Sequence, residues 1–297
     1  MSENIRLAFK GIWSHKLRSI LTMLGVIIGI ASIIAIISTI KGTNEQIMQN
    51  LIGAGNNNVN VQLSQGEQEY YMDAGPPENV APVSQEQIDE IRQMDAVADA
   101  SFYLVRNYAE GITAGVNSLS NGSIRGIDLH YLSTVGLVVS SGRPFMKSDY
   151  TRFRKVALMD ETAANLLFPG KDPVGRVIEI QTEPFVVVGI IHKSDQFQPV
   201  IENLQDYETY HQEESGQVLI PDADWPTIYS YDEPQNCVVR AASTDQMSSV
   251  GKAVEKVMQK SVGGTKNSES ASYKAEDLLE KARNKQELAN STNSLLI

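Results

Sequence analysis

Hydrophobic side chains form one long unbroken run near the N-terminus and many short runs after it. Residues 20–40 contain no charged side chain and lie between Arg18 and Lys41. At about 1.5 Å per residue, a helix over this run is about 30 Å long, which is the thickness of a bilayer core. The pattern therefore predicts a transmembrane helix over residues 20–40.

A cleaved signal peptide and a buried core helix are two alternative interpretations of this run. The apolar part of a signal peptide is usually about 7–15 residues long and ends in an Ala-x-Ala-like site. The run here is longer, and its end, Ser38-Thr39-Ile40, does not fit such a site. We therefore favour an uncleaved anchor.

Small residues recur on one face of the predicted span. Gly25 and Gly29 form a Gly-x-x-x-Gly motif, and Ser32 continues this face one turn later. Small side chains let a second helix approach closely in lipid, where such packing drives association. The motif is common in apolar segments, so it is weak evidence by itself. The candidate helix-packing residues are Gly25, Gly29 and Ser32.

Basic residues gather before the predicted span, although the whole chain has a net charge of −11. Because basic segments remain on the inner side of a membrane, we expect a cytoplasmic N-terminus, a helix in the bacterial cytoplasmic membrane and an extracytoplasmic main domain. Apolar residues at helical spacing predict an amphipathic helix over residues 1–19, with Lys10, Lys16 and Arg18 at the lipid interface. A solvated basic tail is the alternative.

Residues 56–106 predict the first of two β-α-β units. Alternating apolar residues at 59–63 indicate a half-buried strand. Ser84 followed by Gln87 has the pattern of a capping box at the start of a short helix. Residues 97–105 read as the next strand.

Residues 236–273 predict the second unit. Residues 237–239 indicate a strand, Thr244 or Asp245 is expected to cap a helix, and residues 265–273 indicate a weak strand. The apolar face of that helix consists of Met247, Val250, Val254, Val257 and Met258. Two such units far apart in the sequence suggest a split β-α-β-β-α-β domain with an insertion, and hence an α+β fold.

Residues 107–235 form the predicted insertion, which reads as mainly β. Residues 114–128 are compatible with a hairpin, and residues 156–159 with a strand. A short helix over 161–167 is followed by Phe168-Pro169-Gly170, which cannot continue it. The continuous apolar run at 185–191 is typical of a fully buried strand.

Two stalks are expected to flank the domain. Residues 41–55 continue the predicted span without proline, and residues 274–297 include a second charged helical pattern. The last residues, Ser294–Ile297, resemble the start of another transmembrane helix. Since both ends of the domain would return to one bilayer surface, the stalks should form an antiparallel pair.

No catalytic motif accompanies these elements. The chain has no P-loop, His-Glu-x-x-His or Gly-x-Ser-x-Gly motif. The four histidines are scattered and Cys237 is the only cysteine, so we expect no metal site, no cofactor and no disulfide. The negative net charge argues against nucleic acid. A Ser-His-Asp set assembled by folding stays open, because triad members can lie far apart.

Several segments resemble one known family. His15–Ala31 (HKLRSILTMLGVIIGIA) is similar to the first transmembrane segment of MacB/FtsX-type ABC transporter permeases. Gly142–Phe145 (GRPF), Val156–Leu158 (VAL), Leu167–Arg176 (LFPGKDPVGR) and Phe185–Ile190 (FVVVGI) resemble their extracytoplasmic core domain. The core-domain motif residues are Phe168, Pro169, Gly170, Asp172, Pro173 and Gly175.

The resemblance implies a porter-like subdomain over residues 56–106 and 236–273, interrupted by a Sabre-like subdomain over residues 107–235. It also implies a non-catalytic permease that pairs with a second copy, as a homodimer or with a paralogue. Such a permease passes the ATP-driven motion of a separate cytoplasmic ABC ATPase to its outer domain. That domain moves substrate or engages a membrane-fusion adaptor protein.

The sequence departs from this family in one respect. Family members have four transmembrane helices, whereas this sequence reaches only the beginning of a second one. We therefore expect a fragment of a longer permease, a truncated gene product being the alternative. The runner-up function is a single-pass, membrane-anchored extracytoplasmic binding or adaptor protein without an ATPase, and a surface hydrolase is a distant third. The sequence does not identify a transported substrate.

Overall fold

The computed structural model describes residues 16–52, 57–66, 68–194, 216–264 and 270–276. Two parts of the chain, Met1–Gln49 and Asn50–Ile297, are separate compact units. Most of the predicted amphipathic helix, and the second stalk from residue 277 onward, lie outside the described residues. Both therefore stay predictions.

Helix α2 (Lys16–Ile52) is continuous and contains the predicted span. Its segment Ile20–Ser38 is long and apolar enough to cross a membrane, and none of it is buried within the chain. The exposed isoleucine and leucine side chains contradict a core helix, whose apolar face would be covered. The helix ends at Ile52, so it covers most of the predicted first stalk at residues 41–55.

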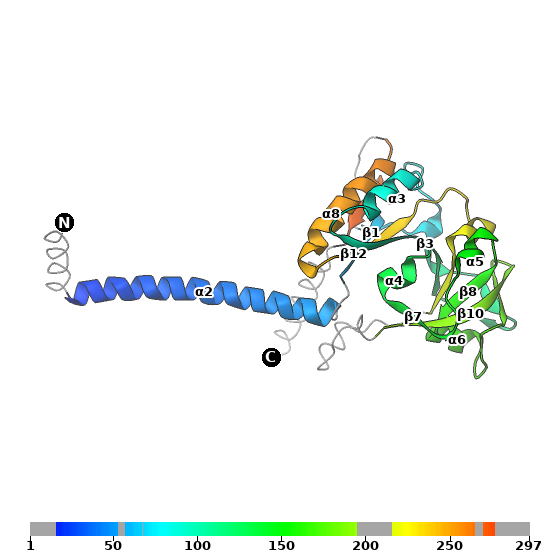
Figure 1. The fold of residues 1–297 in the computed structure, drawn as a ribbon, viewed down its shortest axis with the longest axis horizontal. Coiled ribbons are helices and arrows are strands. Elements are labelled where there is room, and N and C mark those ends of the chain that lie inside the picture. The colour runs from blue at the N-terminus through cyan, green and yellow to red at the C-terminus, as the bar shows by residue number, and fades with distance from the viewer. Residues whose placement is uncertain (1–15, 53–56, 67, 195–215, 265–269, 277–297) are drawn as a thin grey trace. The chain divides into compact units, whose positions relative to one another are not determined.

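The two predicted β-α-β units combine into one antiparallel four-stranded portion of the sheet, in the order β13-β1-β12-β3. The strand predicted over residues 265–273 corresponds to β13, which begins at Ala271, and residues 265–269 lie outside the described residues. Strands from the first unit alternate with strands from the second, so segments far apart in the sequence pair directly. Figure 1 shows α3 and α8 side by side over this portion. The elements are β1 (Asn58–Gln65), α3 (Gln85–Arg92), β3 (Val97–Ala109), β12 (Asn236–Ala241), α8 (Met247–Met258) and β13 (Ala271–Ala275).

The starts of the two helices differ in how well they could be predicted. At α3, Ser84 Oγ accepts a hydrogen bond from the Gln87 N–H and Gln87 Oε1 accepts one from the Ser84 N–H, which is the predicted capping box. At α8 the expected cap is wrong, because a 3-10 turn over Thr244–Gln246 precedes the helix. The Thr244 hydroxyl instead donates to Asn57 Oδ1, 2.9 Å away. The predicted apolar face of α8 is buried.

The insertion extends the same sheet beyond β3. Strand β3 pairs with β12 along its first half and with β6 along its second half. The sheet then continues in the order β6-β11-β8-β10-β9-β4-β5, and β7 also pairs with β10. The strands are β4 (Ile112–Ala114), β5 (Asn117–Ser118), β6 (Gly122–Ile127), β7 (Leu137–Gly142), β8 (Val156–Asp160), β9 (Val177–Ile180), β10 (Glu183–Lys193) and β11 (Gln217–Pro221). The subdomain boundaries at 106/107 and 235/236 stay predictions, since the sheet is continuous there.

Several short elements complete the fold. Helix α6 has the predicted bounds. The helices α4 and α5 and the strand β7 were not predicted, because elements this short carry little periodic signal. The helices are α4 (Tyr131–Val135), α5 (Lys147–Thr151) and α6 (Glu161–Leu167). The remaining elements are β2 (Gln68–Glu69) and the 3-10 turns η1 (Met72–Ala74), η3 (Asp222–Thr227), η4 (Thr244–Gln246) and η5 (Gln259–Ser261).

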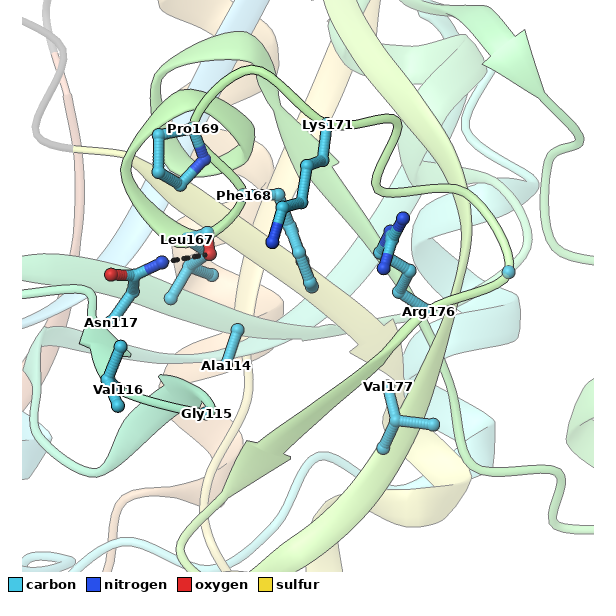
Figure 2. Close-up of a pocket in the computed structure, with 11 residues that line it drawn as sticks. Ala114, Gly115, Val116, Asn117, Leu167, Phe168, Pro169, Lys171, Arg176 and Val177 are labelled. Carbon is cyan, nitrogen blue, oxygen red and sulfur yellow. Dashed lines mark hydrogen bonds between the residues drawn. The ribbon is translucent and has the colours of Figure 1, made fainter.

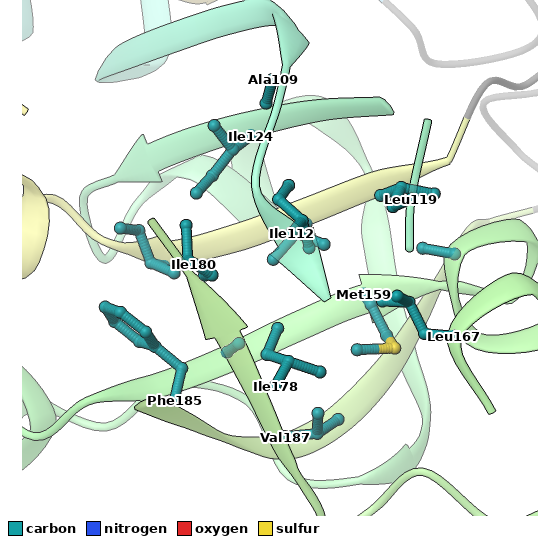
Figure 3. Close-up of a cluster of buried hydrophobic side chains, with 14 of the residues drawn as sticks. Ala109, Ile112, Leu119, Ile124, Met159, Leu167, Ile178, Ile180, Phe185 and Val187 are labelled. Atoms are coloured by element: carbon teal, nitrogen blue, oxygen red, sulfur yellow. The ribbon is translucent and has the colours of Figure 1, made fainter. Parts of the chain in front are cut away.

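The core of the insertion lies between its strands and α6. Figure 3 shows aliphatic and aromatic side chains from β4, β6, β8, β9 and β10 meeting there. Ile112, Ile124, Ile180 and Phe185 are completely buried. Burying a side chain of this size stabilises the fold by about 1.5–3 kcal/mol, so this cluster can hold several short strands together.

Two expectations about strands need correction. The apolar run of β10 is not fully buried: Phe185 and Val187 face the core, but Val186 between them is 40% exposed. Only one face of this part of β10 packs on the core, and side chains alternate between faces. The hairpin is also shorter than the expected 114–128, because β4 and β5 turn at Gly115 and β6 pairs with β3 and β11 instead.

Candidate functional site

The core-domain motif forms a single loop that follows α6. Asp160 caps the start of α6 by accepting a 2.7 Å hydrogen bond from the Ala163 N–H. At the other end of the helix, the Phe168 N–H donates to the Ala164 carbonyl. Gly170 then adopts a φ of +67°, which lets the chain turn away from the helix. The side chain of Phe168 remains packed on the core cluster.

The second half of the motif returns the chain to the sheet. Asp172 Oδ1 accepts from the Val174 N–H at 3.0 Å, and the Pro173 carbonyl accepts from the Arg176 N–H at 3.0 Å. Gly175, with a φ of +81°, donates to the Val187 carbonyl at 2.7 Å. All six predicted motif residues thus lie on one loop, tied by its backbone to α6 and β10.

A pocket with a volume of about 560 Å³ lies beside this loop. One wall is the β4–β5 hairpin and the other is the motif loop with the start of β9, as Figure 2 shows. Asn117 of the hairpin donates a 2.9 Å hydrogen bond to the Leu167 carbonyl at the end of α6, which joins the two walls. The pocket is lined by Ala114, Gly115, Val116, Asn117, Leu167, Phe168, Pro169, Lys171, Gly175, Arg176 and Val177.

The Gly142–Phe145 segment forms a tight crossing between β7 and α5. Gly142 has a φ of +82°, and a Cβ there would lie 2.2 Å from the Val188 carbonyl oxygen. Arg143 then binds the buried Asp149 with both terminal nitrogens, at 2.7 and 3.2 Å. Burial opposes ionisation of Asp149, but hydrogen bonds from Arg143 and the Met146 N–H outweigh it and hold its pKa below the ordinary value.

Sequence reasoning missed a buried ion pair between Arg106 on β3 and Glu233. Both terminal nitrogens of Arg106 donate to the Glu233 carboxylate, which also accepts from Trp225 Nε1 at 2.9 Å. The guanidinium stacks over the Tyr229 ring, with 4.4 Å from Cζ to the ring centroid. The pair connects β3 to the segment after η3, and no sequence spacing links positions so far apart.

Two acidic residues of η3 have reduced contact with solvent: Asp224 is buried and Asp222 is partly buried. Asp224 is completely buried, and neither of its carboxylate oxygens has a hydrogen-bond partner in the described part of the chain. Burial raises its pKa to about 6, which neighbouring Lys155 opposes and Asp149 reinforces. The pKa of Asp222 rises to about 7, because of burial and then the nearby Asp128.

The structure assigns no ligand chemistry to these carboxylates. Across the described residues, no three His, Cys, Asp or Glu side chains lie close enough together to hold a metal ion. Cys237 is a buried free thiol, and burial raises its pKa. The motif loop with its pocket, and α2, are the candidate functional parts.

The predicted membrane residues lie on or before α2. Gly25, Gly29 and Ser32 are within the helix, and the chain itself places nothing within 4 Å of a Cβ at either glycine. The backbones of Lys16 and Arg18 also belong to α2. Their side chains, and all of Lys10, lie outside the described structure, so helix packing and lipid contact stay predictions.

An exposed apolar helix that leads into a sheet-rich domain with interleaved β-α-β units defines a membrane-anchored domain. The sequence matches the family of the MacB-like periplasmic core domain over residues 19–257. The chain belongs to this family of ABC transporter permeases, and the resemblance noted in the sequence is confirmed. Membership of a MacB-type family implies an ATPase partner.

Relatives and solved structures agree with this assignment. The chain is 36% identical over 292 residues to "Uncharacterized ABC transporter permease YvrN" of Bacillus subtilis (strain 168), covering 95% of this chain and 67% of that protein. It is 30% identical over 245 residues to "Macrolide export ATP-binding/permease protein MacB" of Agrobacterium fabrum, covering 82% of this chain but only 37% of that protein. The chain therefore spans only part of these relatives.

Two crystal structures share the fold. The extracellular domain of the noncanonic ABC-type transporter YknZ from Gram-positive bacteria matches with a TM-score of 0.51 and 19% identity, covering 74% of this chain and all of that one. The periplasmic region of MacB from Actinobacillus actinomycetemcomitans matches with a TM-score of 0.53 and 15% identity, covering 82% and 98% respectively. The expected α+β fold is thereby confirmed.

Proposed function

We propose that the chain provides the first membrane span and the outer domain of a MacB-like ABC exporter permease. In this proposal, a separate cytoplasmic ATPase drives a motion that reaches the outer domain, which then moves substrate or engages an adaptor protein. Membership of the family supports the assignment to ABC transporters. In the proposal, this chain would transmit the motion to the outer domain.

The continuity of α2 is the observation that carries this proposal. A single helix runs from Lys16 to Ile52 without a break, through the apolar span and about 14 residues beyond it. A helix rises about 1.5 Å per residue, so these further residues add about 20 Å of hydrogen-bonded backbone. A rigid element of this kind can carry a displacement that a flexible linker would absorb.

The remaining partners belong to the same proposal. Small residues at Gly25, Gly29 and Ser32 would let α2 pack against a second permease copy, a homodimer partner or a paralogue. The basic N-terminal segment favours a cytoplasmic start, and hence an extracytoplasmic sheet domain. A membrane-fusion adaptor would meet that domain outside the membrane.

A break in α2 beyond the span tests the coupling. Asn44→Pro should interrupt the helix, since proline in a helix interior costs about 3 kcal/mol, whereas Asn44→Ala should leave it intact. Both variants are placed in the complete permease and reconstituted with its ATPase in proteoliposomes. We expect ATP-dependent substrate movement to fall at least tenfold in Asn44→Pro and to stay near wild type in Asn44→Ala.

The experiment includes a check on folding. Both variants should insert into membranes at equal levels and give equal thermal unfolding of the sheet domain, because residue 44 lies outside that domain. Unchanged transport by a correctly inserted Asn44→Pro protein would show that α2 does not carry the motion.

A further inference from the structure

The pocket beside the motif loop has features that mechanical coupling does not require. Its volume of about 560 Å³ lies within the range of about 300–1,000 Å³ found for small-ligand sites. Its two walls are fixed to each other by the Asn117–Leu167 hydrogen bond and to the sheet by the backbone of Gly175. The shape is therefore built into the fold before any ligand arrives.

The pocket exposes apolar side chains on both walls. Val116 at the hairpin tip is fully exposed and Val177 on β9 is 51% exposed, whereas Phe168 is 9% exposed and Leu167 is completely buried. Covering exposed apolar surface is favourable in water. The two valines therefore supply most of the apolar surface that a ligand could cover.

Two cations lie on the loop side of this apolar surface. Figure 2 shows Lys171 and Arg176 on either side of Phe168. Arg176 Nε donates to the Asp172 carbonyl at 2.7 Å, which fixes the guanidinium and leaves both terminal nitrogens for another acceptor. Among the described residues, neither cation forms an ion pair with a carboxylate.

We propose that this pocket binds a short peptide segment in which a carboxylate lies next to an apolar side chain. The planar guanidinium fork of Arg176 matches a carboxylate, and Lys171 adds a second positive charge. The apolar walls would cover the neighbouring side chain. A free phosphate would leave those walls exposed, and a long acyl chain would need an enclosed apolar tunnel that two short walls do not provide.

The proposal is tested by peptide binding to the full chain in detergent. The probe is a pool of rhodamine-labelled, C-terminally amidated hexapeptides in which glutamate is flanked by leucine, valine or phenylalanine. A matched pool has glutamine in place of glutamate. We expect fluorescence anisotropy to show saturable binding of the glutamate pool and at least tenfold weaker binding of the glutamine pool.

Variants of the chain assign the binding to this pocket. The double substitution Lys171→Glu with Arg176→Glu should weaken binding of the glutamate pool at least tenfold. Lys171→Gln with Arg176→Gln should weaken it too, and provides a neutral variant if charge reversal disturbs folding. The exposed Lys252→Glu on α8 changes the net charge away from the pocket by as much as the double Gln substitution does, and it should bind as wild type does.

Three outcomes would overturn the proposal. The first is no binding of the glutamate pool up to about 1 mM, the weak end of specific binding. The second is equal binding of the two pools, and the third is displacement of the peptide by inorganic phosphate at equal concentration, which would indicate a plain anion site. The assay requires no ATPase, so its result is independent of the coupling proposed above.

Discussion

At the scale of single residues, the acidic pair in η3 makes the stability of the domain depend on pH. The pKa values of Asp224 and Asp222 rise to about 6 and about 7 from an ordinary value of 3.8. Between these values and 3.8, the folded chain holds protons that the unfolded chain releases. The free energy of unfolding contributed by these two groups therefore decreases as pH rises from about 4 to about 7.

The substitution Asp224→Asn removes the carboxylate that is completely buried. We expect the loss of stability between pH 4 and pH 7 to become smaller, by of order 1–3 kcal/mol in the free energy of unfolding. Trp225 is buried next to this position, so its fluorescence reports the transition. A thermal scan at several pH values gives the measurement.

Asp149→Asn is the matched control, because the pKa of Asp149 is lowered rather than raised. Its ionised form stabilises the fold through Arg143, and this contribution is lost as pH falls below the ordinary value. Asp149→Asn should thus reduce stability at neutral pH. If Asp224→Asn behaved in the same way as Asp149→Asn, the assignment of a buried, unpaired carboxylate would be wrong.

At the scale of elements, the crossing from β7 to α5 depends on a residue without a side chain. Gly142→Ala would bring a Cβ within 2.2 Å of the Val188 carbonyl oxygen and within 2.7 Å of Gly189 Cα. Both atoms are backbone of β10, so the clash cannot be relieved by a rotamer change. We expect a loss of about 3 kcal/mol or more in stability, seen as a lower unfolding temperature.

Gly170→Ala separates this clash from backbone strain. Gly170 also has a positive φ, at +67°, but a Cβ there has nothing within 4 Å. Its substitution should cost only about 1–2 kcal/mol. Equal destabilisation by the two substitutions would indicate that the contact with β10 does not matter.

Most elements follow from local sequence signals. Each of three signals involves only residues that are neighbours in the sequence, so each could be predicted. These are the capping box at Ser84, the stop at Gly170 and the alternating residues of β1. The start of α8 could not, because the Thr244 hydroxyl binds Asn57, a residue far away in the sequence. The exposure of Val186 likewise depends on which strands lie beside β10.

At the scale of the whole molecule, the prediction that matters most is the side of the membrane that the sheet domain occupies. Tyr231 is 88% exposed on this domain, and the native Cys237 is buried. In cells whose outer layers are permeabilised, Tyr231→Cys should react with a membrane-impermeant maleimide, measured as a gel shift. Wild type should give little background.

Ser14→Cys reports the opposite side, because residues 1–19 are predicted to be cytoplasmic. It should react only after the cell membrane is opened. Labelling of Ser14→Cys but not Tyr231→Cys in intact cells would reverse the proposed orientation, and the proposed export function would fail with it.

The sequence alone determined the apolar span, the two β-α-β units and the family, because these depend on periodicity and on motifs that are contiguous in the chain. The tertiary structure alone decided that β1 and β12 are neighbours, that Arg106 meets Glu233, and that Asp224 is buried without a partner. It also decided that Lys171 and Arg176 share a pocket with Val116. The physical reason is that burial and charge pairing depend on which distant segments the fold brings together, and no local pattern records that choice.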